Sequence, residues 1–358
     1  MITSTSAVLT DSGKFEIQEI EMPKLEKDGL LLKVEMVGIC GSDKGIYLGH
    51  NDKRELYPLL LGHEVVGRVE KIGEEAKQIY DVRVGDRVTV LPSIHCNQCR
   101  YCRQGDFRRC TSRHGYGLTR SANEFPFLNG AYSEYLYIVP YSTLFKVDED
   151  VPPQAACMSS VIGNGVRWIK TKGEVKPGDT VVIIGPGAQG LASTIVAKES
   201  GAKRIIAVGL ELDAHKLETA RQLGATHTFF IDKDDVLQEV AKITNQDMAD
   251  VVVTCTGAES ALHLGIDLVK PMGKIVLVGL NNGKYQLFDL NKVIRNEIQL
   301  IGGYGQIGDM EYAVEIINSK KYEVEKIVSH IFPLQQAEEA MKLFVEKPEQ
   351  CIRVALRP

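Results

Sequence analysis

Four of the eight cysteines lie close together in the chain, at Cys96, Cys99, Cys102 and Cys110. Thiolates two residues apart can point at one tetrahedral metal centre, and four of them fill every coordination position of a zinc ion. The alternatives are free thiols, disulfides or an iron–sulfur cluster. Free thiols or disulfides would require four cysteines to lie close together by chance, in a chain that contains few other cysteines. The spacing favours a closed structural zinc site, which shapes a loop and performs no chemistry.

A second set of metal-binding residue types is spread over two short glycine-containing segments. Cys40 lies in Gly-Ile-Cys-Gly-Ser-Asp, and His63 and Glu64 follow Gly62. One thiolate, one imidazole and a carboxylate are ligands that suit a catalytic zinc, which keeps a position open for a substrate oxygen. A further protein ligand must come from elsewhere, and Cys157 is the candidate, although a lone cysteine is more often a small buried hydrophobe.

A glycine motif follows a short apolar run. Gly185, Gly187 and Gly190 come directly after the expected strand 180–184 and open an expected helix. In this context the glycines let the backbone approach a pyrophosphate at the positive end of the helix. The acidic residue expected after the next strand is Glu211, whose carboxylate would bind the ribose hydroxyls and repel a 2′-phosphate. NAD is therefore favoured over NADP, although Gly209 leaves NADP open.

The pattern of apolar residues indicates two kinds of element that position these groups. Residues 14–151 contain short apolar stretches broken by Gly, Pro and Asp, as in a β-rich domain with long loops. Beyond residue 179, strands alternate with helical runs, which implies a doubly wound parallel sheet. We predict an α/β protein with a β-rich catalytic domain over 1–155 plus 301–358 and a nucleotide-binding domain over 156–300.

The amino-acid composition of the chain indicates which classes of binding partner to expect. The 358 residues are 44% hydrophobic and 25% charged, with a net charge of −5, which is typical of a globular protein with small-molecule partners and without a nucleic-acid footprint. The first nine residues lack a basic segment followed by an apolar run, and apolar runs elsewhere are strand-sized. We therefore expect no membrane contact and, with metal thiolates, a cytoplasmic location.

The order of these motifs resembles that of the zinc-containing medium-chain alcohol dehydrogenase family, especially its polyol or sorbitol, threonine and secondary-alcohol branches. The shared segments are 38–43, 62–67, 84–88, the four-cysteine loop and 185–190, so the resemblance covers nearly the whole chain. It implies a GroES-like catalytic domain joined to a Rossmann domain. It also implies that Cys40 and His63 are catalytic zinc ligands and that Glu64 is a neighbouring carboxylate that binds the metal at some stage. Ser42 corresponds to the hydroxyl that accepts the substrate proton.

The resemblance leaves open which residue is the third metal ligand and which residue ends the proton relay. Cys157 occupies the third ligand position if residues 159–161 align with the corresponding segment of polyol dehydrogenases, and it is preferred to Met158, which would be a poor zinc ligand. The proton relay often ends in a histidine soon after the serine, but Lys44 and Gly45 fill that stretch here. His50 could serve if its loop folds back, and the alternative is a solvent-exposed loop histidine. Gln189 belongs to the glycine motif, and Lys216 lies near the ribose in the family pattern.

Together these features predict an NAD-linked dehydrogenase with two zinc ions per subunit, which interconverts a small secondary alcohol or polyol and its ketone. Residues 295–305 read as an edge strand, which in this family pairs across a two-fold axis, so a homodimer or homotetramer is expected. The rival hypotheses are a non-catalytic relative and a zinc-free quinone or enone reductase, and the complete ligand set argues against both.

Overall fold

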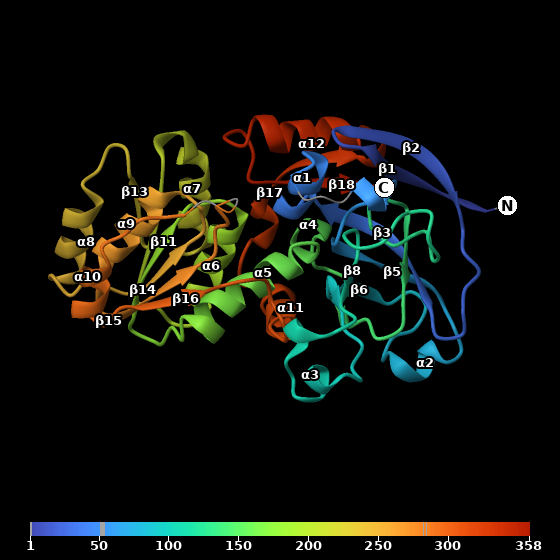
Figure 1. Ribbon diagram of the computed structural model, residues 1–358, viewed down its shortest axis with the longest axis horizontal. Coiled ribbons are helices and arrows are strands. Elements are labelled where there is room, and N and C mark those ends of the chain that lie inside the picture. The colour runs from blue at the N-terminus through green and yellow to red at the C-terminus, as the bar shows by residue number, and fades with distance from the viewer. Residues whose placement is uncertain (1, 51–53, 282, 284) are drawn as a thin grey trace. The chain divides into compact units, whose positions relative to one another are not determined.

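The computed structural model of the chain describes residues 2–50, 54–281, 283 and 285–358, which form two compact units (Figure 1). The first unit comprises Met1–Ser160, Val314–Lys320 and Val324–Pro358, and the second comprises Val161–Ala313 and Lys321–Glu323. Two of the boundaries lie inside helices, one in α5 (Ser159–Val166) and one in α11 (Met310–Asn318).

The units differ from the predicted domain ranges mainly at residues 301–313, which belong to the second unit. Hydrogen bonds explain the difference. The backbone N–H of Gln306 donates to Asn164 Oδ1 at 2.8 Å, and the Asp309 carboxylate accepts from Arg167 at 3.1 Å and from Thr171 at 2.6 Å. This segment is thereby tied to residues 164–171 of the same unit, which sequence patterns alone do not reveal.

The first unit is built on a large sheet with the strand order β10-β6-β5-β3-β18-β17, in which β9 also pairs with β3. Its strands are β3 (Leu30–Gly38), β5 (Glu64–Ile72), β6 (Arg87–Val90), β9 (Tyr135–Ile138), β10 (Leu144–Lys146), β17 (Val328–Pro333) and β18 (Arg353–Arg357). A second sheet of order β2-β1-β4 contains β1 (Thr3–Asp11), β2 (Lys14–Glu21) and β4 (Leu59–Leu60), and β7 (Ser93–Ile94) pairs with β8 (His114–Gly115). The nearly continuous apolar run of β3 suits a strand that is buried on both faces.

The helices of the first unit are short, apart from one that packs on the large sheet. They are α1 (Gly41–Tyr47), α2 (Ala76–Ile79), α3 (Arg100–Arg103), α4 (Pro153–Ala156) and α12 (Ala337–Glu346). Helix α12 packs against β17 and β18, and its residues Ala337, Ala340 and Met341 join the core. The i, i+3, i+4 spacing of these residues is that of a helix with one apolar face.

The register of three neighbouring strands brings distant parts of the sequence together. Gly38, the last residue of β3, is paired with Glu64 at the start of β5 and with Ala355 in β18. The backbone N–H of Ile39 also donates to the carbonyl of Val354 at 2.8 Å. The segments that follow β3, precede β5 and begin β18 therefore meet at one place.

The second unit is a six-stranded parallel sheet of order β13-β12-β11-β14-β15-β16 (Figure 1). This is the strand order of a dinucleotide-binding doubly wound fold. The strands are β11 (Thr180–Ile184), β12 (Arg204–Gly209), β13 (His227–Phe230), β14 (Ala249–Thr254), β15 (Val269–Leu277) and β16 (Gln299–Gly302). The helices are α6 (Ala188–Glu199), α7 (Ala214–Leu223), α8 (Val236–Thr244), α9 (Glu259–Leu268) and α10 (Leu290–Arg295).

Valine and isoleucine dominate the central strands of this sheet. All five residues of β11 are buried, as are the last four of β14, because helices cover the sheet. Among the described residues, no helix has the length and apolar content that a membrane crossing requires.

Candidate active site and metal centres

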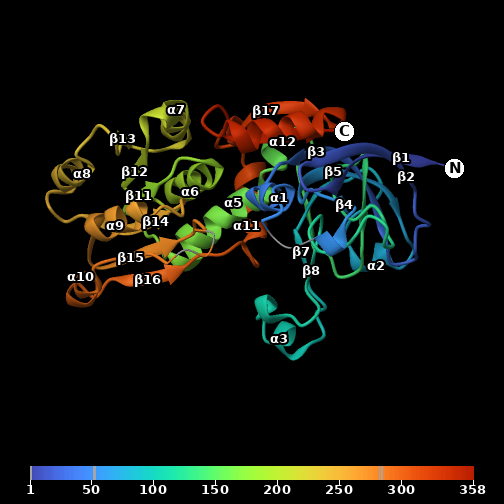
Figure 2. The ribbon, with the colours of Figure 1, turned by 45° about the horizontal axis from the view of Figure 1, so that its top comes forward.

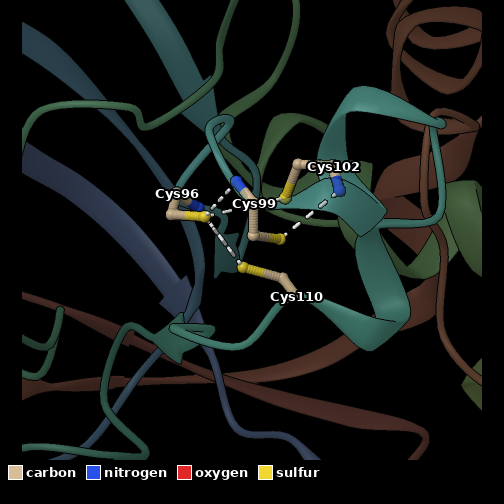
Figure 3. Close-up of side chains that lie close together, drawn as sticks. All are labelled: Cys96, Cys99, Cys102 and Cys110. Carbon is tan, nitrogen blue, oxygen red and sulfur yellow. Dashed lines mark hydrogen bonds between the residues drawn. The ribbon is translucent and has the colours of Figure 1, made fainter.

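The thiols of Cys96, Cys99, Cys102 and Cys110 point toward one another (Figure 3). The Sγ atom of Cys96 lies 3.6 Å from that of Cys110 and 3.9 Å from that of Cys102. Sulfur atoms about 2.3 Å from a tetrahedral zinc ion stand about 3.8 Å apart, whereas a disulfide bond measures about 2.05 Å. The geometry therefore fits a zinc tetrathiolate.

Backbone N–H groups inside the same loop donate to these sulfur atoms. Cys96 donates to Cys110 Sγ at 3.4 Å, Cys99 to Cys96 Sγ at 3.3 Å, and Cys102 to Cys99 Sγ at 3.5 Å. Donation from the backbone of Cys102 and Thr111 lowers the pKa of Cys99 to about 6. Burial instead raises the pKa of Cys102 to about 12, so the surroundings favour the thiolate, the form that binds metal, at Cys99 and not at every thiol of the loop. Figure 2 shows the α3 lobe that carries this cluster extending away from the sheets of its own unit.

Cys40, His63 and Glu64 form a second group, whose ligand atoms all lie within 4.8 Å of one another. Cys40 is the N-cap residue of α1, and His63 and Glu64 stand where the chain enters β5. His63 and Glu64 are buried, with 7% and 2% of their surface exposed. The structure thus brings together three predicted ligands that are separated in the sequence.

A buried carboxylate supports the imidazole of His63. Asp43 Oδ1 lies 3.5 Å from His63 Nδ1, and its Oδ2 accepts the N–H of Cys40 at 2.8 Å and the hydroxyl of Tyr132 at 3.1 Å. Nδ1 faces Asp43, so Nε2, which lies 3.4 Å from the Ser42 hydroxyl oxygen, is the ring nitrogen that could bind a metal. A carboxylate behind the second ring nitrogen is a recurrent feature of histidine ligands.

The charges around His63 favour a cation. Burial opposes protonation of the imidazole, but the negative charges of Asp43 and Cys40 outweigh it and raise the pKa of His63 to about 10. The same negative field would attract a metal ion, which competes with the proton for the ring nitrogen. The donor set of this group fits zinc.

Glu64 is paired with a buried arginine that the sequence analysis did not single out. Arg353 Nη2 lies 3.4 Å from Glu64 Oε1, and Arg353 Nη1 donates to the carbonyl of Ile39 at 2.8 Å. Within the described part of the chain, Glu64 Oε2 and His63 Nδ1 have no hydrogen-bond partner. Buried polar atoms are rarely left in this state, and a bound metal ion would explain that of Glu64 Oε2, whereas His63 Nδ1 faces the Asp43 carboxylate.

The predicted third ligand lies outside this group. Cys157 is fully buried at the end of α4, and its thiol donates to the carbonyl of Gln154 at 3.4 Å. Burial raises the pKa of this thiol well above its usual range. Met158, the next residue, instead extends toward Gly38, where a Cβ would meet Met158 Cε at 2.9 Å and Glu64 Oε2 at 2.5 Å.

Ser42 lies in the first turn of α1, and its hydroxyl oxygen is 3.4 Å from His63 Nε2. A hydroxyl at this place can exchange a proton with a group that binds beside the imidazole. His50, the candidate end of the proton relay, is exposed.

The glycine motif forms a tight turn between β11 and α6. Gly185 has φ +99°, a conformation that favours glycine, and Gly187 is the N-cap residue of α6. A side chain on Gly190 would overlap the carbonyl of Gly185, so only glycine fits there. Gln189 accepts a hydrogen bond from Asn164 at 3.4 Å. The N-terminus of α6 therefore fits a pyrophosphate.

The predicted ribose-binding residues follow β12. Glu211 is exposed and forms an ion pair with Lys233. Lys216 is buried and pairs with Asp213 at 2.8 Å, an acidic residue that the sequence analysis did not consider. The i, i+3 spacing of Asp213 and Lys216 at the start of a helix could have indicated this ion pair from the sequence.

A pocket of about 490 Å³ lies beyond the carboxyl ends of β14 and β15. Ligands of doubly wound sheets bind at this edge. Its lining residues are Thr256, Gly257, Ala258, Glu259, Leu280, Asn281, Tyr285 and Gln286.

Three residues near the metal groups escaped the sequence analysis, namely Asp43, Tyr132 and Arg353. Asp43 belongs to the motif around Cys40, and its spacing from Cys40 is that of a helix cap, so local sequence could have indicated its role. Tyr132 and Arg353 come from distant segments and had no local signal.

Known protein families and individual relatives match this chain over most of its length. The family model of the alcohol dehydrogenase GroES-like domain matches residues 26–149, and that of the zinc-binding dehydrogenase matches residues 188–319. A probable alcohol dehydrogenase of Mycobacterium tuberculosis is 34% identical over 346 residues, covering 93% of this chain and 92% of its own. The sorbitol dehydrogenase of Halalkalibacterium halodurans is 32% identical over 349 residues, covering 97% and 96%.

A zinc-binding dehydrogenase of Sinorhizobium meliloti, solved with NADP bound, has the same fold, with a TM-score of 0.86, 24% identity and complete coverage of both chains. The matched models and relatives together span both units. The chain is therefore an oxidoreductase that belongs to the zinc-containing medium-chain alcohol dehydrogenase family.

Proposed function

We propose that this protein is a zinc-dependent, NAD-linked dehydrogenase that reversibly oxidises a secondary alcohol or polyol, such as a sugar alcohol, a diol or a threonine-like substrate, to the ketone. The observation that carries the proposal is the meeting of Cys40, His63 and Glu64 in a buried group within a dehydrogenase fold. Relatives named as sorbitol and threonine dehydrogenases support this substrate class. A panel of alcohols and polyols, followed by NADH absorbance, tests it.

In this proposal the chain's own residues hold the metal and move the proton. Cys40 and His63 would hold the ion, with Glu64 beside them, and Asp43 keeps the imidazole oriented. When bound, zinc acts as a Lewis acid that lowers the pKa of an alcohol hydroxyl. Ser42 Oγ, next to His63 Nε2, would accept the proton that the hydroxyl releases and pass its own hydroxyl proton on toward solvent. The glycine turn before α6 would hold the nicotinamide cofactor.

We further propose two zinc ions per subunit, with the second in the four-cysteine lobe. The free state of all eight cysteines in the structure is consistent with a reducing, cytoplasmic environment. Metal analysis separates this function from that of a zinc-free reductase of the same superfamily. Two zinc ions per subunit would support the dehydrogenase, and none would favour the reductase.

Glu211→Arg is expected to shift cofactor preference toward NADP. Removing a carboxylate that repels the 2′-phosphate and adding a cation should change the ratio of kcat/KM for the two cofactors by at least about tenfold. Glu218→Arg is a matched control, since Glu218 is an exposed glutamate on α7 of the same unit. An equal shift in both variants would indicate a general effect of charge, and no shift would exclude Glu211 as the determinant.

We also propose a homodimer or homotetramer that forms through the β16 edge of the second unit. Strand β16 ends the sheet, and seven exposed large apolar residues lie between residues 272 and 304. These residues are Met272, Leu280, Tyr285, Leu287, Leu290, Ile294 and Tyr304. Exposed apolar side chains in the segments before and after an unpaired edge strand are typical of a subunit interface.

The double variant Leu290→Glu/Ile294→Glu is therefore expected to dissociate the assembly, because it places two charges on that surface. Light scattering after size-exclusion chromatography measures the mass. Leu237→Glu is the control, since Leu237 is also exposed on a helix of the second unit, α8. An unchanged mass in the double variant would refute this interface.

A further inference from the structure

We propose that Asn164 is a positioning residue, which holds the segment 303–306 against the start of α6 and thereby orients the nicotinamide end of the cofactor. This inference rests on the proposed function, because it presupposes that the second unit binds a dinucleotide. Asn164 lies in α5, within the second unit, and belongs to neither metal group.

The side-chain amide of Asn164 joins two parts of the second unit that are far apart in the sequence. Its Oδ1 accepts the backbone N–H of Gln306 at 2.8 Å, and its Nδ2 donates to Gln189 Oε1 at 3.4 Å. Gln189 lies in the first turn of α6, beside the glycine turn, and Gln306 follows the end of β16. An amide suits this place, because one side chain offers both an acceptor and a donor.

The helix that carries Asn164 is packed closely against both of these parts. A Cβ added to Gly165 would stand 2.8 Å from the carbonyl oxygen of Ala192 in α6, so only glycine allows this approach. On the other side, the indole N–H of Trp168 donates to the carbonyl of Tyr304 at 3.4 Å. The backbone of the helix is therefore held close to α6 and to the segment after β16, and the amide of Asn164 spans the space between them.

The strand order explains why this link matters for a dinucleotide. Such a ligand binds across the carboxyl ends of a doubly wound sheet, with one half on each side of the first strand, here β11. The residues predicted to bind the adenosine ribose follow β12, so the nicotinamide half would lie on the side of β14, β15 and β16. The segment 303–306 begins where β16 ends and therefore borders that half.

The two ends of the segment are anchored by different groups. At its start, the N–H of Gly303 donates to the carbonyl of Leu277 at the end of β15, at 2.7 Å. At its end, the N–H of Gln306 would lose its acceptor if the amide of Asn164 were removed. The pyrophosphate site depends instead on the backbone of the glycine turn and on α6. Loss of the amide should therefore affect the nicotinamide end and spare the rest of the cofactor.

Calorimetric titration with NADH and with ADP-ribose tests the proposal, because ADP-ribose contains the pyrophosphate and both riboses without the nicotinamide. We expect full-length Asn164→Ala to raise the Kd for NADH about 5-fold to 10-fold, the effect of one lost hydrogen bond, and the Kd for ADP-ribose by less than about twofold. Gln306→Ala is the matched control, since it keeps the backbone N–H that Asn164 accepts. It should leave both constants unchanged.

Asn164→Asp should restore the ratio of the two constants, because a carboxylate oxygen still accepts the N–H of Gln306. Repulsion of the pyrophosphate by the new charge would act on both ligands and leave this ratio unchanged. A ratio altered as much as in Asn164→Ala would contradict the proposal, and circular dichroism confirms that each variant is folded.

Trp168 provides a second readout, because it is the only tryptophan of the chain and bonds to the same segment. Its side chain is 3% exposed, so acrylamide should quench its fluorescence poorly. In the absence of cofactor we expect stronger quenching in Asn164→Ala, where the segment is loosened, and unchanged quenching in Asn164→Asp.

The titrations separate failure of this inference from failure of the proposed function. Equal weakening of NADH and ADP-ribose in Asn164→Ala, or no weakening of either, would overturn the inference and leave the dehydrogenase function standing. If the unsubstituted protein bound neither ligand, the proposed function would fail and this inference with it.

Discussion

His63→Ala is expected to lower kcat/KM for alcohol oxidation by at least about 10³-fold. A Lewis acid supplies several kcal/mol to such a reaction, and each 1.36 kcal/mol corresponds to about a tenfold change in rate. The side chain is buried between Ser42 and Asp43, and among the described residues its ligand group contains no second histidine that could replace it. Steady-state kinetics with the best alcohol of the panel measures the loss.

Cofactor binding should be retained in this variant, because the glycine turn lies in the other unit. Calorimetric titration with NADH checks it, and metal analysis should show one zinc ion fewer per subunit. His330→Ala is a suitable control, since His330 is a half-buried histidine of the same unit that belongs to neither metal group. Full activity after loss of one zinc ion would contradict the assignment of His63 as a ligand of the catalytic metal.

Cys99→Ser/Cys110→Ser is expected to remove the other zinc ion and to unfold the lobe around α3. Four thiolates hold this loop, and structural zinc in such sites contributes about 10 to 16 kcal/mol of binding free energy in isolated zinc-finger peptides. The lobe has little other support, because α3 spans only Arg100–Arg103 and the nearest strand pair, β7 with β8, has two residues in each strand.

Limited proteolysis with trypsin measures this effect well, because the loop contains Arg100, Arg103, Arg108, Arg109 and Arg113. We expect cleavage within residues 100–113 at a trypsin concentration that leaves the unsubstituted protein intact. Cys351→Ser, at a buried cysteine outside the lobe, should remain resistant. Resistance of the double variant, with its zinc content unchanged, would show that the four-cysteine cluster does not hold the metal.

Much of the second unit follows from local sequence. The expected strand 180–184 is β11, and the glycine motif opens α6, because a continuous apolar run followed by glycine has few other interpretations. The predicted edge strand within residues 295–305 is present as β16. Strand β13 had no such signal, since His227–Phe230 is only half-buried at the opposite edge of the sheet.

In the candidate site too, some residues were predicted from local sequence, whereas the direction of one side chain depended on tertiary packing. The four-cysteine cluster and the pair His63–Glu64 were predicted from residue type and spacing, since thiolates and imidazoles have few other reasons to gather. Cys157 was selected by its residue type and its place in the chain, but the direction of its side chain depends on how α4 begins and packs. One residue of helix rotates a side chain by about 100°, which is why Met158 faces Gly38 while the Cys157 thiol bonds to its own helix.

The amino-acid sequence by itself determined which chemistry the chain can perform, because ligand types, glycine turns and apolar periodicity are properties of short segments. Tertiary structure alone decided which groups share a site. Arg353 reaches Glu64 only because β18, at the far end of the chain, pairs with β3, and Tyr132 reaches Asp43 across a separation of 89 residues in sequence. Contacts of this kind depend on strand register, and the energy that selects a register comes from the packing of the whole unit.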